Sequence, residues 1–416
     1  MRKFSVSAGA LAVLLTATAL TGCSLLSESS GKAPAEARQS SSGTSVEELR
    51  RKYTGYGFKA LKTVEEQLLY ADIDESANKL KSEDFFGRGF TETNRVTDIL
   101  ELYKDDHPEV FWIDETEPYY YTQEPNGMTL QLHFKLEGEE LQKARGELDA
   151  AVKEALEDAP VDGTDYQKEL YAHDRLIDNC IYDDEAVEMH KQSQVRGNEQ
   201  NAYGALVEGK AVCEGYTRAF QILCDRLDVK CWVIQGKALN FGDDGKVNHI
   251  WNCVQLEDSW YYVDVTWDDY EDAPAPTDHY FYFNLTTEEL VKDHEISPLY
   301  TESKDTNVWV NGYVPECTAT KYNYFNLNAH PIDSAEAAGC ARFVAEAAAN
   351  KSASCCFLVS QDADFEEVFD EVVNGSAYDW VSGANEINGY DPQISANCKL
   401  SNNTERRVIT LILDYE

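Results

Sequence analysis

The amino-acid sequence predicts an α+β protein of two or three domains. Apolar residues recur at helical spacing over residues 46–80, whereas short apolar segments at 119–136 and at 247–267 are paired across short polar loops, as in β-hairpins. Hydrophobic residues make up 43% of the 416 residues, which is enough to fill sizeable cores. We therefore expect helices packed on sheets that are built from hairpins.

The chain begins with the features of an export signal. Arg2 and Lys3 form a short positive segment, and residues 8–20 are apolar but too short to span a membrane comfortably. Residues 1–22 are therefore predicted to be a signal peptide. It ends in Leu20-Thr21-Gly22-Cys23, which resembles the lipobox of bacterial lipoproteins. The resemblance implies cleavage before Cys23 and a diacylglyceryl group on its sulfur; the alternative is an ordinary signal peptide with an incidental cysteine.

Residues 23–45 are predicted to be a flexible tether. The segment is rich in Ser, Gly, Ala and Glu and has no hydrophobic periodicity. Several acyl chains suffice for stable anchoring, whereas a single chain would be marginal. We therefore expect an exported protein that is lipid-anchored through Cys23 to the outer side of a bacterial membrane.

The composition is strongly acidic and excludes some partners. Lysine and arginine number 36 against 75 aspartates and glutamates, which gives a formal net charge of −39. Nucleic acid, anionic lipids and anionic wall polymers would be repelled by such a surface, so we predict no nucleic-acid partner. The charge could favour cationic peptides or amines, or it could serve solubility alone.

The cysteines do not form a disulfide-rich or zinc-binding pattern. There are 11, and with Cys23 assigned to lipid and Cys213 to chemistry an odd number remains. No Cys-x-x-Cys pair occurs, so we predict no metal site. Cys355 and Cys356 are adjacent in an apolar segment, and we expect core thiols there rather than a bridge. Other pairs could form disulfides outside the cytoplasm.

Residues 46–160 are predicted to form an N-terminal α+β region, and residues 161–298 a catalytic core. In the first, we expect a helix at 96–103 that ends at 107–109, a strand that begins at 110–113, a hairpin of 119–122 and 129–136, and a helix at 138–158. The core is expected to open with a helix at 166–180.

After a linker at 299–316, residues 317–416 are predicted to form a small accessory α+β domain. Its expected elements are strands at 321–325 and 355–360, helices at 334–349 and 364–373, and strands near 394–400 and 407–413. Asp362 and Asp364 begin like a calcium-binding loop, but the sixth position is Glu367 rather than Gly, so we reject a calcium site.

Cys213 is the candidate nucleophile. A helix is predicted to begin at or near it, because Tyr216, Phe220, Leu223 and Leu227 recur at helical spacing. A thiolate at the first turn would be stabilised by the helix dipole, and the unpaired backbone N–H groups there could hold an oxyanion. The alternative is a buried structural cysteine, which is the commoner fate of a free thiol.

His249 and Asp264 are the candidate base and its orienting carboxylate. The segment 247–267 is predicted to be a hairpin whose two-residue loop sets His249 opposite Thr266. His249 and Asp264 then project from one face as diagonal neighbours, about 7 Å apart at the backbone. A loop of odd length would send Asp264 to the other face. Asp264 lies among apolar residues, where an unpaired carboxylate is costly, so it needs a partner.

These segments resemble the transglutaminase-like superfamily, a papain-related group of thiol enzymes, and look most like the versions in bacterial surface lipoproteins. The residues that carry the resemblance are 204–216 (Gly-Ala-Leu-Val-Glu-Gly-Lys-Ala-Val-Cys-Glu-Gly-Tyr), 249–252 (His-Ile-Trp-Asn) and 260–267 (Trp-Tyr-Tyr-Val-Asp-Val-Thr-Trp), with similarity also at 182–183 and 281–285. The resemblance implies a transglutaminase/papain-like core in which a nucleophile helix packs on an antiparallel sheet.

The resemblance also implies roles for the three residues. Cys213 would be the nucleophile, His249 the general base and then acid, and Asp264 the orienter. The implied reaction is acyl transfer through a thioester, which water or an amine resolves. The animal transglutaminases use calcium, but no calcium motif occurs in this sequence, so we predict no cofactor.

Other residues near the motifs have less specific interpretations. The second oxyanion donor, beside the Cys213 backbone, could come from the nearby Gln200, Asn201 or Tyr203. Trp251, Trp260 and Trp267 are interpreted as core or as walls of the cleft. The acidic residues of 268–272 could select cationic groups or could simply be solvated. His173 and Asp174, on the helix before the core, could support the catalytic residues from behind, but they are interpreted as packing or solvated residues.

Two functions from different classes compete. The first is a surface-anchored cysteine acyltransferase or peptidase, or a deamidase, that acts on protein or wall-peptide amides. The second is a non-catalytic binding module that uses the same fold as a scaffold. The presence of all three residues, Cys213, His249 and Asp264, favours the first.

Overall fold

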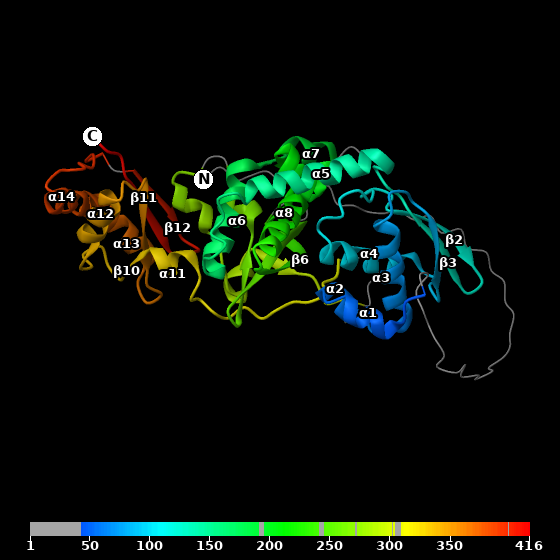
Figure 1. Cartoon of the computed structure of the whole chain (residues 1–416). Helices are drawn as coiled ribbons and strands as arrows, with labels where there is room; N and C mark the ends of the chain where they lie inside the picture. Colours follow the sequence, from blue (N-terminus) through cyan, green and yellow to red (C-terminus); the bar gives the residue numbers. More distant parts are fainter. Residues whose placement is uncertain are drawn as a thin grey trace.

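The computed structural model describes residues 43–190, 195–240, 245–270, 273–301, 303, 309–397 and 399–416. These residues form three parts in a row, with the N-terminal helices and hairpin at one end, α8 and β6 in the centre and the C-terminal part at the other end (Figure 1). The predicted signal peptide, Cys23 and nearly all of the predicted tether lie outside the described residues. Within the described ranges, no helix has the length and apolar character that a membrane span requires.

The N-terminal part combines helices with a three-stranded antiparallel sheet of order β1-β3-β2. Its elements are α1 (Val46–Lys52), α2 (Tyr56–Ala60), α3 (Val64–Ala77), β1 (Asp84–Arg88), α4 (Thr93–Asp106), β2 (Tyr119–Glu124), β3 (Gly127–Leu132) and α5 (Gly138–Ala155). The predicted hairpin, the helix that ends at His107 and the helix from residue 138 are confirmed. The periodic segment 46–80 divides into three helices, because Gly55 and Thr63 act as new N-caps.

The prediction of a strand that begins at Val110 is wrong. Residues 110–113 are buried but belong to no strand; they follow a turn in which Val110 N–H donates to the His107 carbonyl at 3.0 Å and Phe111 N–H to the Glu109 carbonyl at 3.2 Å. Only Ile113 makes a single bridge, to Phe134. All four side chains are buried, so the apolar run reflects packing on every side rather than a strand.

The central part packs a helix on a four-stranded antiparallel sheet of order β8-β7-β6-β9. The elements are α6 (Asp165–Asn179), β4 (Ile181–Tyr182), α7 (Asp184–His190), η1 (Asn198–Gln200), η2 (Gly204–Glu208), β5 (Lys210–Ala211), α8 (Cys213–Arg226), β6 (Lys230–Leu239), β7 (Lys246–Leu256), β8 (Ser259–Val263), α9 (Val265–Asp268), η3 (Pro276–Tyr280), α10 (Thr287–Leu290) and β9 (His294–Ile296). The helix predicted to begin at Cys213 is confirmed as α8. The sequence did not predict β6, because it is buried on both faces and shows no alternation.

The predicted hairpin register is correct up to Val263 and wrong beyond it. Leu256 pairs with Ser259, as a two-residue loop requires. The strand then ends, and Thr266, which was predicted to face His249 across the hairpin, lies in the short helix α9. The strand stops because Asp264 is the N-cap of α9, where its side chain accepts a hydrogen bond from the Trp267 N–H at 3.3 Å.

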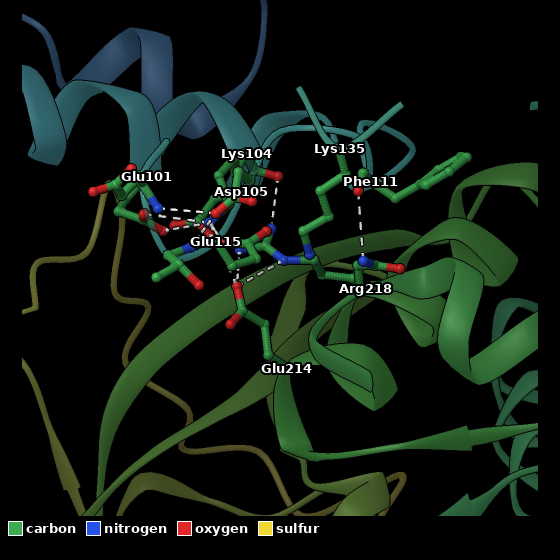
Figure 2. Close-up of polar contacts among 12 residues, drawn as sticks. Glu101, Lys104, Asp105, Phe111, Glu115, Lys135, Glu214 and Arg218 are labelled. Carbon is green, nitrogen blue, oxygen red and sulfur yellow. Dashed lines mark hydrogen bonds and ion pairs between the residues drawn. The ribbon is translucent and has the colours of Figure 1, made fainter. Parts of the chain in front are cut away.

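A cluster of buried charges fastens α4 to α8 (Figure 2). The members of this buried charge cluster are Glu101, Lys104, Asp105, Glu115, Glu214 and Arg218. Arg218 donates to the Lys104 carbonyl at 2.7 Å and to Glu214 at 2.7 Å, while the Lys104 ammonium lies 2.5 Å from Glu115. Opposite charges thus compensate one another where water is excluded. Because Glu214 and Arg218 lie in the first turns of α8, the cluster holds the helix that begins at Cys213.

The C-terminal part has its own hydrophobic core around a four-stranded sheet of order β10-β11-β13-β12. Its elements are α11 (Tyr324–Asn328), β10 (His330–Ile332), α12 (Cys340–Ala349), β11 (Ser354–Val359), α13 (Phe365–Glu371), η4 (Val372–Ser376), α14 (Ala377–Ile387), β12 (Lys399–Asn403) and β13 (Val408–Ile412). The predicted strand at 355–360, the helix at 364–373 and the last strand are confirmed as β11, α13 and β13. Cys355 and Cys356 are both buried core cysteines, as expected.

Three C-terminal predictions need correction. The segment 321–325 is not a strand, because the Asn323 side chain accepts from the N–H groups of Phe325 and Asn326 and so caps helix α11. The alanine-rich helix begins at Cys340, after Gly339 with a φ of +100°, rather than at residue 334. The strand expected near 394–400 is β12, which is displaced to Lys399–Asn403. Helix α14 was not predicted.

Loss of the Lys104 charge is expected to destabilise the fold strongly. Lys104→Met leaves Glu115 buried without its cation, while Glu214 keeps Arg218, and the loss costs about 3–5 kcal/mol of unfolding free energy. The matched control is Lys143→Met, since the Lys143–Glu147 pair at 3.0 Å is exposed and its loss changes stability by less than about 0.5 kcal/mol. Urea unfolding measures both, and equal effects of the two substitutions would contradict this role of the cluster.

Candidate active site

Cys213 lies at the first position of α8, where backbone N–H groups have no helical partner. Its neighbour Val212 is the N-cap and provides no side-chain cap, so these N–H groups are open to a ligand. Segment 199–201 lies against this turn: Val212 N–H donates to the Glu199 carbonyl at 2.9 Å, and a Cβ on Gly215 would come within 2.7 Å of the same oxygen. Cys213 is half-buried, whereas the other described cysteines are buried. Cys213 is therefore the most exposed of the described cysteines.

His249 lies on β7, between the Cys213 sulfur and the Asp264 carboxylate. Its Nε2 is 2.6 Å from Asp264 Oδ2, which leaves Nδ1 for the hydrogen bond with Cys213. Burial disfavours the charged imidazole, but Asp264 and Cys213 outweigh burial and raise the pKa of His249 to about 9. The rings of Trp251 and Trp267 stack on His249 at centroid distances of 5.7 and 5.4 Å. The imidazole is thus fixed in position and ready to carry a proton.

Asp264 is almost fully buried and accepts from two imidazoles. Besides His249, Nε2 of His294 lies 3.1 Å from the same oxygen, Oδ2. Burial alone would raise the pKa of Asp264, but the two histidines hold that pKa well below its usual range. The other oxygen, Oδ1, accepts the Trp267 N–H. Asp264 therefore remains ionised and its orientation is fixed.

Trp251 is buried rather than part of an open cleft wall, whereas Trp267 is partly exposed. Trp251 packs over Gly236 on β6, where a Cβ would come within 2.5 Å of the indole ring. Gly236 is paired with His249 in the sheet, so the absence of its side chain makes room for the indole beside the imidazole. Trp260 lies away from the site, in an aromatic group with Tyr56 and Tyr313.

Two of the three suggested oxyanion donors are engaged elsewhere. The Tyr203 hydroxyl donates to Glu147 at 2.8 Å, and its ring stacks on Phe111. Asn201 is buried; its side-chain oxygen accepts the Tyr203 N–H, and its amide donates to the Phe111 carbonyl. The assignment of Tyr203 to the cleft or oxyanion hole therefore stays a prediction, and its hydroxyl is already bonded to Glu147. Gln200 follows Glu199, whose carbonyl contacts the start of α8, and it remains the candidate.

Of the acidic residues in 268–272, Asp268 and Asp269 are bonded to neighbouring side chains. Asp268 is fully buried, where it lies 3.1 Å from Nε2 of His173 and accepts the Tyr282 N–H at 2.7 Å. Asp269 accepts the Tyr216 hydroxyl at 2.5 Å. Residues 271–272 lie outside the described residues. The packing interpretation of His173 is correct, because its buried ring joins α6 to α9.

The spacing of His249, Asp264 and His294 would also suit a metal ion. The nitrogen and oxygen atoms that could bind a metal lie within 4.8 Å of one another. Among the described residues, this is the one group of three or more His, Cys, Asp or Glu residues with such spacing. Each imidazole Nε2 is within hydrogen-bonding distance of Asp264 Oδ2, so protons account for the short separations. A metal ion would displace those protons, and we assign the cluster to hydrogen bonding.

Sequence reasoning missed two residues of the site. His294 comes from β9, 30 residues after Asp264, and no local motif marks it. Tyr182 lies close to Cys213: burial, followed by the nearby thiol, raises the pKa of its phenol well above the usual value. Tyr182 belonged to a dipeptide with family similarity, which was a signal for the site, whereas His294 had none.

Two curated relatives and several solved structures are similar to parts of the chain. It is 36% identical over 64 residues to the kyphoscoliosis peptidases of Homo sapiens and Mus musculus, which is 14% of this chain and 10% of each relative. The chain therefore spans about a tenth of the length of these relatives. A crystal structure of a TGase has 17% identity and a TM-score of 0.25, over 36% of this chain and 43% of that one. A candidate cysteine protease from Cytophaga hutchinsonii has 13% identity and a TM-score of 0.23, over 36% and 61%.

Structural similarity at these TM-scores supports no conclusion about the fold or the activity. The match to a family model is more informative. Residues 158–265, which include Cys213, His249 and Asp264, match the model described as the transglutaminase-like superfamily. Residues 158–265 are therefore a transglutaminase-like domain.

Proposed function

We propose that this protein is a thiol acyltransferase or hydrolase that acts on peptide or side-chain amides. Its superfamily consists generally of thiol enzymes, which supports an enzymatic function. The observation that carries the proposal is the contact of Cys213 with His249, whose Nε2 is hydrogen-bonded to the buried Asp264 at 2.6 Å. A half-buried thiol, a base and an orienting carboxylate are the groups that nucleophilic catalysis requires.

The first step forms a thioester. His249 takes the thiol proton on Nδ1, and the Cys213 thiolate attacks the amide carbonyl, so that the C=O electron pair moves to oxygen. The backbone N–H groups at the start of α8 are placed to stabilise that oxyanion. The intermediate then collapses: the C–N bond breaks, His249 gives its proton to the leaving amine, and Asp264 keeps the imidazole in the required tautomer.

The second step resolves the thioester. Water or a primary amine gives a proton to His249 Nδ1 and attacks the thioester carbonyl, after which the C–S bond breaks and Cys213 takes the proton back. Water yields a shortened peptide or a deamidated side chain, and an amine yields a new amide. We expect substrates among surface proteins or wall peptides, because the lipobox-like segment supports anchoring through Cys23 outside the membrane.

Selective alkylation tests whether Cys213 is activated. Neutral iodoacetamide is expected to modify Cys213 faster at about pH 7 than the other described cysteines, because His249 contacts its sulfur and can take the thiol proton, whereas the other thiols are buried. His249→Ala should abolish this advantage, and peptide mapping by mass spectrometry identifies the site. The buried thiols Cys224 and Cys253 serve as internal controls. Modification of Cys213 no faster than of a free cysteine in solution would favour the binding module.

The pH dependence reports the His249 proton. Its pKa is raised from 6.5 to about 9, so the imidazolium that protonates the leaving amine is present below that pH and is lost above it. We expect kcat/KM on a neutral amide substrate to decline as the pH rises through about 9. Asp264→Asn removes the raising charge, so the decline should move to lower pH by at least one unit. An alkaline limb at the same pH in both proteins would contradict the assignment.

Product analysis decides between the possible outcomes of the second step. The soluble form from residue 24 onward is incubated with peptides and with a casein whose lysines are methylated, with and without a labelled primary amine. A released peptide fragment indicates a peptidase, ammonia alone a deamidase, and incorporated amine a transferase. Cys213→Ala is the control and should remove every product; products that persist in this variant would contradict a Cys213 thioester.

A further inference from the structure

The hydrogen bonds of the candidate active site continue beyond Asp264. The buried His294 contacts Asp264 Oδ2 through Nε2 at 3.1 Å and Asp293 Oδ1 through Nδ1 at 2.7 Å. Both ring nitrogens therefore face carboxylate oxygens, which accept protons but do not donate them when ionised. A doubly protonated imidazole satisfies both contacts, so His294 is a buried cation between two carboxylates.

The surroundings of His294 hold the ring in place. Trp251 from β7 meets it edge to face at a centroid distance of 4.8 Å, and Trp267 from α9 lies at 4.3 Å. Burial disfavours a charged ring here, but the hydrogen bonds to Asp264 and Asp293 outweigh burial and raise the pKa of His294. The His294 ring can move only if the two tryptophans and the two carboxylates move with it. Its position therefore depends on Asp293, which is one of these carboxylates.

Asp293 is in turn held by a residue of the C-terminal part. Its Oδ2 accepts the Tyr282 hydroxyl at 2.8 Å and lies 3.6 Å from Nη2 of Arg406. Arg406 comes from the turn between β12 and β13, more than 110 residues later in the chain, yet 4% of its side chain is exposed. A buried guanidinium requires a compensating charge, and Asp293 is the carboxylate with which it forms an ion pair.

Arg406 is fixed in the central part from several sides. Its Nε donates to the Phe281 carbonyl at 3.0 Å and its Nη1 to the Glu289 carbonyl at 3.0 Å. The guanidinium also lies over the Tyr282 ring, 4.8 Å from its centroid. These contacts fix the buried guanidinium so that Nη2, which has no hydrogen-bond partner among the described residues, lies 3.6 Å from the Asp293 carboxylate.

We propose that Arg406 is a positioning residue of the active site, which acts through Asp293 and His294 to hold Asp264 against His249. Opposite charges alternate from Arg406 through Asp293 and His294 to Asp264. Asp264 in turn contacts the His249 imidazole, which contacts Cys213. The C-terminal part thereby completes the catalytic machinery without contact with the substrate. This inference depends on the proposed function, since it assigns a means of holding the same three residues.

The test compares three substitutions at the contact between the central and C-terminal parts. Arg406→Gln removes the charge that faces Asp293. Ser401→Ala removes the hydrogen bond from Ser401 Oγ to Asp278 Oδ2, 2.8 Å long, which joins the same two parts but does not touch the path to Asp264. Arg406→Lys restores a cation at the end of a long side chain. The readout in the full chain is the rate at which neutral iodoacetamide alkylates Cys213 at pH 7, with the melting temperature measured alongside.

We expect Arg406→Gln to slow alkylation about tenfold, because a less firmly held Asp264 leaves His249 less often in position to take the Cys213 proton. Arg406→Lys should recover part of that loss, and Ser401→Ala should leave the rate unchanged. Once a turnover assay exists, kcat should fall while KM stays constant. In a double-mutant cycle, Arg406→Gln and His294→Gln should be non-additive, since both break one path.

Several results would overturn the inference. One is an Arg406→Gln variant that folds and whose Cys213 is alkylated at the wild-type rate. Another is a Ser401→Ala variant that slows alkylation equally, because it would indicate general damage to the contact between the central and C-terminal parts. If Arg406→Gln fails to fold, the isosteric Asp293→Asn takes its place under the same criteria. If Cys213 of the wild-type protein shows no enhanced reactivity, the proposed function itself is refuted. If the wild type is reactive but the variants react at the same rate, only the role of Arg406 is refuted.

Discussion

The buried charge of Asp264 is the constraint on which the site depends. A carboxylate that is 1% exposed is stable only with donors on its oxygens, and Asp264 finds them in two imidazoles and a backbone N–H. The same residue ends strand β8 and begins helix α9. Asp264 therefore both ends strand β8 and holds the His249 imidazole, so one residue determines a boundary of the sheet and the geometry of the site.

The other half of the site is fixed from the opposite side. The nucleophile is at the start of α8, and the first turns of that helix belong to the buried charge cluster contributed jointly with α4 (Figure 2). Buried ion pairs add little net stability compared with apolar packing, but an unmatched arrangement is costly, so they specify which helix faces which. The N-terminal part thus positions the sulfur and, in our proposal, the C-terminal part positions the carboxylate.

The sequence predicted the features that depend on local signals. Helical spacing after Cys213 identified the start of α8, and the two-residue loop identified the pairing of Leu256 with Ser259. It could not predict where β8 ends, because the local pattern of 259–267 is equally apolar on both sides of Asp264, and a cap competes there with strand pairing. It also could not predict β6, which is buried on both faces, or His294, which reaches Asp264 only through the pairing of β9 with β6. Contacts of that kind are set by tertiary structure rather than by spacing along the chain.

The most direct measurement of the central claim is a ¹⁵N NMR titration of the His249 ring in the wild type and in Cys213→Ala. If Cys213, His249 and Asp264 act as one unit, Nε2 keeps its proton throughout, Nδ1 titrates near pH 9 in the wild type, and the substitution lowers that value because the thiolate is lost. If Nδ1 instead titrates at the usual value for histidine, about 6.5, and Cys213→Ala leaves the titration unchanged, the three residues do not form a catalytic unit.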